Sequence, residues 1–170
     1  MDFTSAVVFE IRDILEEYRE TYAEIKNTKP QDILDNYNRY PIEIINIGVD
    51  LDVSVTQPIV SEVPAIYLGY GNVRHQVPDL VASNPIEKKI FTVILSTIVA
   101  SSGKADDQKK VKASGDMRQL IKGIAKGLIN FAHGEVYVER AYINKSTTDA
   151  GVVSGFQRTI HELDVEFYEE

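Results

Sequence analysis

The segment that most constrains the fold is the apolar and β-branched run KKIFTVILSTIVA, residues 88–100. The run lacks the alternation that would leave one side of a strand in water, which is typical of a central strand covered on both faces. It is too short to cross a bilayer as a helix, and Thr92, Ser96 and Thr97 interrupt it. We therefore predict a soluble protein whose sheet is built around this strand.

An amphipathic helix is predicted near the amino terminus. Apolar residues between Phe3 and Ile25 fall on one stripe at about 100° per residue, and residues 27–30 end the pattern. The opposite side collects carboxylates, namely Glu10, Asp13, Glu17, Glu20 and Glu24. This helix is expected to present a line of negative charge.

A second helix is predicted to open near residues 114–116 and to close at Gly134. Its apolar stripe consists of Met117, Leu120, Ile121, Ile124, Leu128 and Phe131. Beside it a basic stripe recurs every fourth residue, formed by Arg118, Lys122 and Lys126. Gly123 and Gly127 flank the buried side, which indicates close approach of a neighbour from the same chain or from another copy.

The remaining apolar segments are predicted as strands from their β-branched and aromatic content and from the turn residues beside them. They are residues 41–49, 64–71, 135–143 and 154–170, of which the last two form an antiparallel hairpin. The expected fold is α+β, a single domain over residues 1–170 with a mostly antiparallel sheet flanked by the two amphipathic helices.

Residues 101–115 are predicted to form a long loop. The Gly103-Lys104 pair lacks the first glycine and the final hydroxyl of a phosphate-binding loop, because Ile98 and Ala105 occupy those positions. Nucleotide binding is therefore not expected. The loop carries Lys104, Lys109, Lys110 and Lys112, and it is either a surface excursion or a segment that becomes ordered against a partner.

Three carboxylates alternate along the last predicted strand, namely Glu162, Asp164 and Glu166. Apolar residues occupy the positions between and after them, so the strand has one polar and one apolar face. Carboxylates at this spacing could hold a hard cation, but a solvated polar face opposite a buried apolar face explains the pattern without a ligand. We expect the solvated face and no metal.

A competing interpretation comes from Pro78-Asp79 and Glu87-Lys88-Lys89, which resemble the PD...ExK signature of a nuclease superfamily. That resemblance implies that Asp79 and Glu87 bind a divalent metal and that Lys89 orients water. The gap between the two halves is short and the formal net charge of −8 does not favour a DNA-binding face. A metal-dependent nuclease is kept as an alternative.

Composition excludes other classes of function. Without cysteine the chain has no disulfide, no thiolate zinc site and no thiol nucleophile. The histidines lie apart in the sequence, and no serine stands in a G-x-S-x-G motif. We expect no enzymatic activity, no catalytic residue, no cofactor, no sequence-specific nucleic-acid binding and no membrane contact.

The chain resembles the small tail terminator, or tail completion, proteins of tailed bacteriophages and related contractile injection particles. The resemblance lies in its size, its acidic opening helix, the strand IFTVILSTIVA with the following loop, DMRQLIKGIAKGLINF, and the closing FQRTIHELDVEFYEE. It implies an α+β subunit that forms a ring, typically of six copies, at the tail or neck of the virion. Such a ring caps the tail tube or sheath and joins it to the head connector, after assembly in the host cytoplasm.

For a ring subunit, the sequence predicts contacts between opposite charges on neighbouring copies. The basic stripe of one copy would face carboxylates of the next, on either the first helix or the last strand, and the lysine-rich loop would order against the tube, sheath or connector. The expected interface residues are Lys104, Lys109, Lys110, Lys112, Arg118, Lys122, Lys126, Glu162, Asp164 and Glu166. A monomeric adaptor for one protein partner is the remaining alternative.

Overall fold

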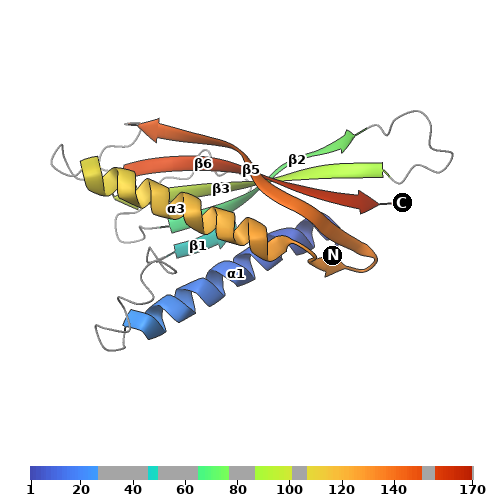
Figure 1. The fold of residues 1–170 in the computed structure, drawn as a ribbon, viewed down its shortest axis with the longest axis horizontal. Helices are drawn as coiled ribbons and strands as arrows, with labels where there is room; N and C mark the ends of the chain where they lie inside the picture. Colours follow the sequence, from blue (N-terminus) through green and yellow to red (C-terminus); the bar gives the residue numbers. More distant parts are fainter. Residues whose placement is uncertain (27–45, 50–64, 77–86, 101–106, 151–155, 170) are drawn as a thin grey trace.

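The computed structural model describes residues 1–26, 46–49, 65–76, 87–100, 107–150 and 156–169. The elements in chain order are α1 (Phe3–Lys26), β1 (Asn46–Val49), β2 (Ala65–Gln76), β3 (Glu87–Ala100), α3 (Asp107–Leu128), β4 (Ala132–His133), β5 (Val136–Ala150) and β6 (Phe156–Glu169). Figure 1 shows a twisted sheet with α1 and α3 on the same side of it.

The described strands form one six-stranded sheet in the order β1-β2-β3-β6-β5-β4. β1 runs parallel to β2, and the other neighbouring pairs are antiparallel. β3 lies in the interior, between β2 and β6, as its continuous apolar run predicts. The predicted α+β fold with a mostly antiparallel sheet is confirmed, and the parallel pairing of β1 makes the sheet mixed.

The hydrophobic core lies between the helices and one face of the sheet. Every second residue of β3 and β6 points into it, because successive side chains of a strand alternate between faces. The buried side chains include Phe91, Val93, Leu95, Leu163, Val165 and Phe167 from these strands, Val7, Ile11 and Leu15 from α1, and Met117, Ile121, Ile124 and Leu128 from α3. Burial of each large apolar side chain stabilises the fold by about 1.5–3 kcal/mol.

The close neighbour predicted at the glycines of the second helix is α1 of the same chain. A Cβ atom built on Gly127 would lie 3.4 Å from Cδ1 of Ile14, an ordinary van der Waals distance, so this side of α3 contacts α1. Gly123 has nothing within 4 Å of the same position. A neighbour from the same chain is thus confirmed at Gly127 and not found at Gly123, where contact with another copy stays a prediction.

α3 begins earlier than predicted, at Asp107 instead of near Ser114. Residues 107–115 of the predicted loop are therefore helical, and Lys109, Lys110 and Lys112 belong to this helix. Lys and Gln favour helices even where the apolar stripe is absent, which explains why periodicity missed these turns. Lys104 lies outside the described residues.

Two strands continue where turns were predicted. β2 passes through Gly71-Asn72 with a shift of register between Tyr70 and Val73, so that Gly-Asn pair forms a bulge. β5 extends to Ala150, with further shifts of register along its pairing with β6. The small strand β4 was not predicted; it pairs with β5 across a two-residue turn whose Gly134 has φ +65.

Candidate functional site

The polar face of the sheet, meaning the side away from α1 and α3, is the first candidate site. Glu162, Asp164 and Glu166 of β6 lie on it, because Leu163 and Val165 occupy the core on the opposite side. The predicted division of this strand into a polar and an apolar face is therefore confirmed. The sequence did not reveal which groups contact these carboxylates.

Asp164 forms the centre of one polar cluster. Its side chain is only 2% exposed, and its Oδ2 atom lies 2.6 Å from Nη2 of Arg74, which is on β2. Its Oδ1 atom accepts a hydrogen bond of 2.7 Å from the hydroxyl of Thr92 on β3. Both carboxylate oxygens are thus bonded within the chain, and Arg74 reaches across β3 to make the ion pair.

Glu166 forms the centre of a second cluster. The Lys88 ammonium lies 3.2 Å from Oε2 without the alignment of a hydrogen bond, and Nε of Arg140 lies 3.8 Å from the same oxygen. The hydroxyl of Tyr142 donates a hydrogen bond of 3.2 Å to Oε1. Burial of Tyr142, reinforced by the negative charge of Glu166, raises the pKa of this phenol.

The expectation of a solvated carboxylate row is therefore wrong for Asp164 and Glu166, which are buried. Partners from β2, β3 and β5 cover them, and none of these partners is adjacent to them in sequence. Burial of a charge is unfavourable unless the charge is paired, so these contacts are needed to keep both carboxylates buried in the folded chain. Glu162 remains half-buried and makes no ion pair with a described residue.

A hollow of about 210 Å³ adjoins the Asp164 cluster on the polar face. Its lining residues are Gly71, Asn72, Arg74, Thr92, Ile94, Asn144 and Glu162. These amide, hydroxyl and carboxylate groups suit hydrogen bonding to a polar side chain of a partner. Within the described part of the chain, no group of three or more His, Cys, Asp or Glu residues is arranged to hold a metal ion.

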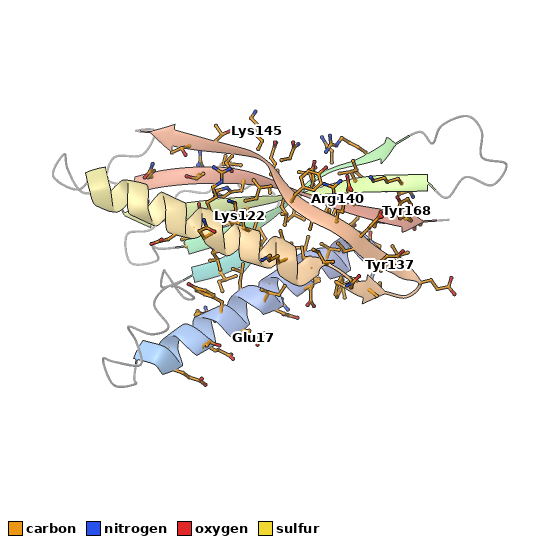
Figure 2. The ribbon with its side chains drawn as sticks, viewed as in Figure 1. Glu17, Lys122, Tyr137, Arg140, Lys145 and Tyr168 are labelled. Carbon is orange, nitrogen blue, oxygen red and sulfur yellow. The ribbon has the colours of Figure 1, made fainter. Side chains whose placement is uncertain are left out.

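The exposed surface of α3 is the second candidate site. Arg118, Lys122 and Lys126 are all exposed, and none of them forms an ion pair with another described residue. The basic stripe predicted from sequence is therefore present on the surface of the structure, and Figure 2 shows Lys122 on the outer side of α3. Its charges are available to a partner.

The exposed surface of α1 carries the opposite charge. Asp13, Glu17, Glu20 and Glu24 are exposed, and Glu10 is half-buried. Asp13 contacts Arg12 at 3.3 Å, whereas Glu17, Glu20 and Glu24 have no ion pair among the described residues. Figure 2 shows Glu17 on the part of α1 that faces away from the sheet.

Two large apolar side chains accompany these charges, and sequence reasoning missed both. Phe9 of α1 is 37% exposed, and the guanidinium of Arg12 lies 4.7 Å from the centre of its ring. Ile129, which directly follows α3, is 45% exposed. Their exposure could have been predicted, because both residues lie outside the apolar stripes of the predicted helices. An apolar residue outside such a stripe does not belong to the core.

His161 of β6 lies on the core side of the sheet. It is buried, with Nδ1 2.8 Å from the hydroxyl of Ser146 and Nε2 3.4 Å from the hydroxyl of Thr97. Burial, with a smaller effect of the positive charge of Arg118, lowers the pKa of His161 to about 4. The imidazole is therefore neutral at pH 7 and serves as a hydrogen-bonding group between β3, β5 and β6.

The residues of the nuclease signature are brought together only in part. Asp79 lies outside the described residues, and Glu87 is the first residue of β3. Nζ of Lys89 lies 2.5 Å from Oε2 of Glu169, the last residue of β6. The lysine that would orient water is thus bonded to a carboxylate outside the signature.

No helix in the described part of the chain is both long enough and apolar enough to span a membrane. No protein-family model matches the sequence, and no curated protein matches it. Among solved structures, the chain is similar to one from the virion of a native gene transfer agent (GTA) particle, with a TM-score of 0.40 and 9% sequence identity. The match covers 87% of this chain and 91% of the other. A likeness at this distance assigns neither a family nor a function.

Proposed function

We propose that the chain is a structural subunit of a virion that works by assembling with copies of itself, without enzymatic activity. The observation that carries this proposal is the pair of oppositely charged helix surfaces. The bases of α3 and most carboxylates of the exposed α1 surface are unpaired within the described part of the chain. Unpaired charges of opposite sign on separate surfaces favour association in a fixed orientation.

The finer form of the proposal is a tail terminator or neck subunit. A ring, typically of six copies, would cap the tail tube or sheath and join it to the head connector. The acidic first helix, the central strand and the second helix, on which the resemblance depends, form the described fold. Copies that bind through two different surfaces form a closed ring when the rotations from each copy to the next add up to a full turn.

The polar clusters are consistent with a structural role. Asp164, Glu166 and Lys89 each contact a partner within the sheet, so these groups hold strands together. A nuclease would need the lysine of its signature beside bound metal and water. The contact between Lys89 and Glu169 favours the structural role over the nuclease.

Immunogold electron microscopy tests the location of the subunit. Antibody raised against the full chain is applied to intact particles purified from the organism that carries the gene. The proposal predicts gold label at one position, the junction between tail and head. Label along the whole tail, label on the head shell, or particles without label would overturn the terminator assignment.

A further inference from the structure

We propose that the basic surface of α3 in one copy docks onto the acidic surface of α1 in the next copy. The basic surface is defined here as Arg118, Lys122, Lys126 and Ile129, and the acidic surface as Phe9, Asp13, Glu17, Glu20 and Glu24. This contact rests on the proposed ring function and identifies which surfaces of the subunit meet.

Burial distinguishes the two acidic partners that the sequence allowed. Asp164 and Glu166 of the last strand are 1% and 4% exposed and are bonded to groups of their own chain. Bases from another copy could reach them only by displacing those bonds. Glu162, the remaining carboxylate of that strand, is half-buried, whereas Glu17, Glu20 and Glu24 of α1 are exposed and need no such displacement, so α1 is the acceptor.

Among the described residues of one chain, the bases of α3 form no ion pair with α1. Gly127 faces Ile14 and so marks the side of α3 that contacts α1. Arg118 precedes Gly127 by nine residues, which is about two and a half helical turns and places it on the opposite side of the helix. Arg118 therefore points away from α1 of its own chain, and none of the three bases forms an ion pair with a described residue of that chain, so their acidic partner belongs to another copy.

The two charged surfaces are similar in length. Arg118 to Lys126 spans about 12 Å along the helix axis, and Asp13 to Glu24 spans about 16 Å, at about 1.5 Å per residue. The acidic surface is long enough to meet all three bases of the partner. Because exposed ion pairs contribute little binding energy, this match sets the register of the contact more than its strength.

Exposed apolar side chains accompany both charged surfaces. Ile129 is 45% exposed and Phe9 is 37% exposed, so each charged surface carries one large apolar group that is not buried in its own chain. An apolar anchor surrounded by charge is the usual composition of a protein interface, with strength at the anchor and orientation from the charges. Phe9 and Ile129 are therefore the expected anchors.

The two surfaces differ, so the contact is heterologous. Each copy uses its basic surface on one neighbour and its acidic surface on the other, and repetition of this contact builds a ring if it closes. A two-fold dimer would instead use both surfaces between the same two copies. The number of copies in the assembly distinguishes these arrangements.

Charge reversal on the full chain tests the contact. One variant reverses the basic surface (Lys122→Glu with Lys126→Glu), and the other reverses the acidic surface (Glu17→Lys with Glu20→Lys). Each variant alone presents two surfaces of the same sign, and we expect the protein concentration at half-assembly to rise at least tenfold. Native mass spectrometry measures assembly, and circular dichroism checks that each variant is folded.

Mixing the two variants should restore assembly, because the reversed α3 surface of one variant matches the reversed α1 surface of the other, and their two unreversed surfaces also match. The mixed assemblies should contain equal numbers of both variants. A chain with all four substitutions should assemble alone. The matched controls are Glu135→Lys and Lys145→Glu, which reverse exposed charges outside both surfaces and should leave assembly unchanged.

The outcomes separate this contact from the proposed function. If the wild-type chain assembles and both reversed variants assemble equally well, the contact is wrong and the ring function stands. If each variant loses assembly but the mixture does not regain it, the two surfaces are not partners and the contact is again wrong. A wild-type chain that stays monomeric at every concentration overturns the proposed function itself. If the variant reversed at the basic surface is unfolded, Lys122→Gln with Lys126→Gln replaces it and should also weaken assembly.

Discussion

Arg74 and Asp164 are 90 residues apart in sequence and lie on strands that are not neighbours, yet their charged groups are 2.6 Å apart. The Arg74 side chain crosses β3 to reach β6, and Thr92 of β3 donates to the other oxygen of the same carboxylate. One carboxylate thus joins three strands on the polar face. Whether this cluster stabilises the sheet can be measured by removing one partner at a time.

Arg74→Ala is expected to lower the free energy of unfolding by about 1–3 kcal/mol, because it leaves the buried carboxylate of Asp164 with only one hydrogen bond. Urea unfolding followed by circular dichroism measures this loss. The matched control is Arg140→Ala, since Arg140 is 66% exposed and lies 3.8 Å from Glu166. The control should change the free energy of unfolding by about 0–1 kcal/mol. Equal losses in the two variants would contradict the account.

Gly71→Ala is expected to lower the free energy of unfolding by about 1–3 kcal/mol through overpacking. A Cβ atom at Gly71 would lie 2.4 Å from the carbonyl oxygen of Thr92, so the backbone of β2 or β3 must move. Thermal unfolding of both proteins measures the change. Gly123→Ala is the control: nothing lies within 4 Å of the added methyl group, and alanine in a helix should stabilise by about 1 kcal/mol. A fully stable Gly71→Ala protein would show that the two strands are not in contact as described.

His161 predicts a loss of stability in mild acid. Its pKa is lowered from 6.5 to about 4 in the folded chain, so the unfolded chain binds the proton more readily between these values. The free energy of unfolding should therefore fall as the pH drops from about 6.5 to about 4, by up to about 3 kcal/mol from this group. Urea unfolding of the wild type and of His161→Gln over this pH range measures the difference, because glutamine keeps hydrogen-bonding capacity without a titrating ring.

The wild type should lose more stability on acidification than His161→Gln does. The Arg118→Gln variant should lose less stability on acidification than the wild type, because the positive charge of Arg118 disfavours the protonated imidazole of His161. Parallel pH profiles for the wild type and His161→Gln would show that the imidazole is accessible to water.

Assembly should weaken with salt if the charged helix surfaces guide it. The Debye length falls from about 10 Å at 0.1 M to about 3 Å at 1 M ionic strength, which screens exposed charge pairs. Sedimentation velocity at the two salt concentrations should show weaker association at high salt. The Ile129→Ser variant should assemble more weakly than the wild type at both salt concentrations. Salt-independent assembly would indicate that the contact uses other surfaces.

The sequence predicted the elements that periodicity defines. The alternation in β6 predicted its apolar face correctly, and the apolar run of β3 predicted a strand in the interior of the sheet. The expected cover on both faces of β3 is only partial, because both helices lie on one side of the sheet and Thr92 and Ile94 on the other side are half-buried. The start of α3 was missed because its first turns carry no apolar stripe, and the predicted strand stopped at residue 71 because the glycine of the Gly71-Asn72 bulge is also typical of a turn. Local patterns identify an element better than they identify its ends.

The candidate site was predictable only where it depends on one element. The basic stripe of α3 follows from spacing along one helix, and the structure leaves it exposed. The burial of Asp164 depends on Arg74, whose position is set by strand order and by the bulge in β2. Strand order is a property of the whole fold, so no local pattern revealed that this carboxylate is covered.

The central claim, that the chain acts by assembling with copies of itself, is tested most directly by native mass spectrometry of the wild-type protein over a wide range of concentrations. The account predicts one closed assembly with a fixed number of copies, six in the form proposed, that grows in population as concentration rises. A strict monomer at all concentrations, as expected for a single-partner adaptor, or a dimer that never grows further, would contradict it.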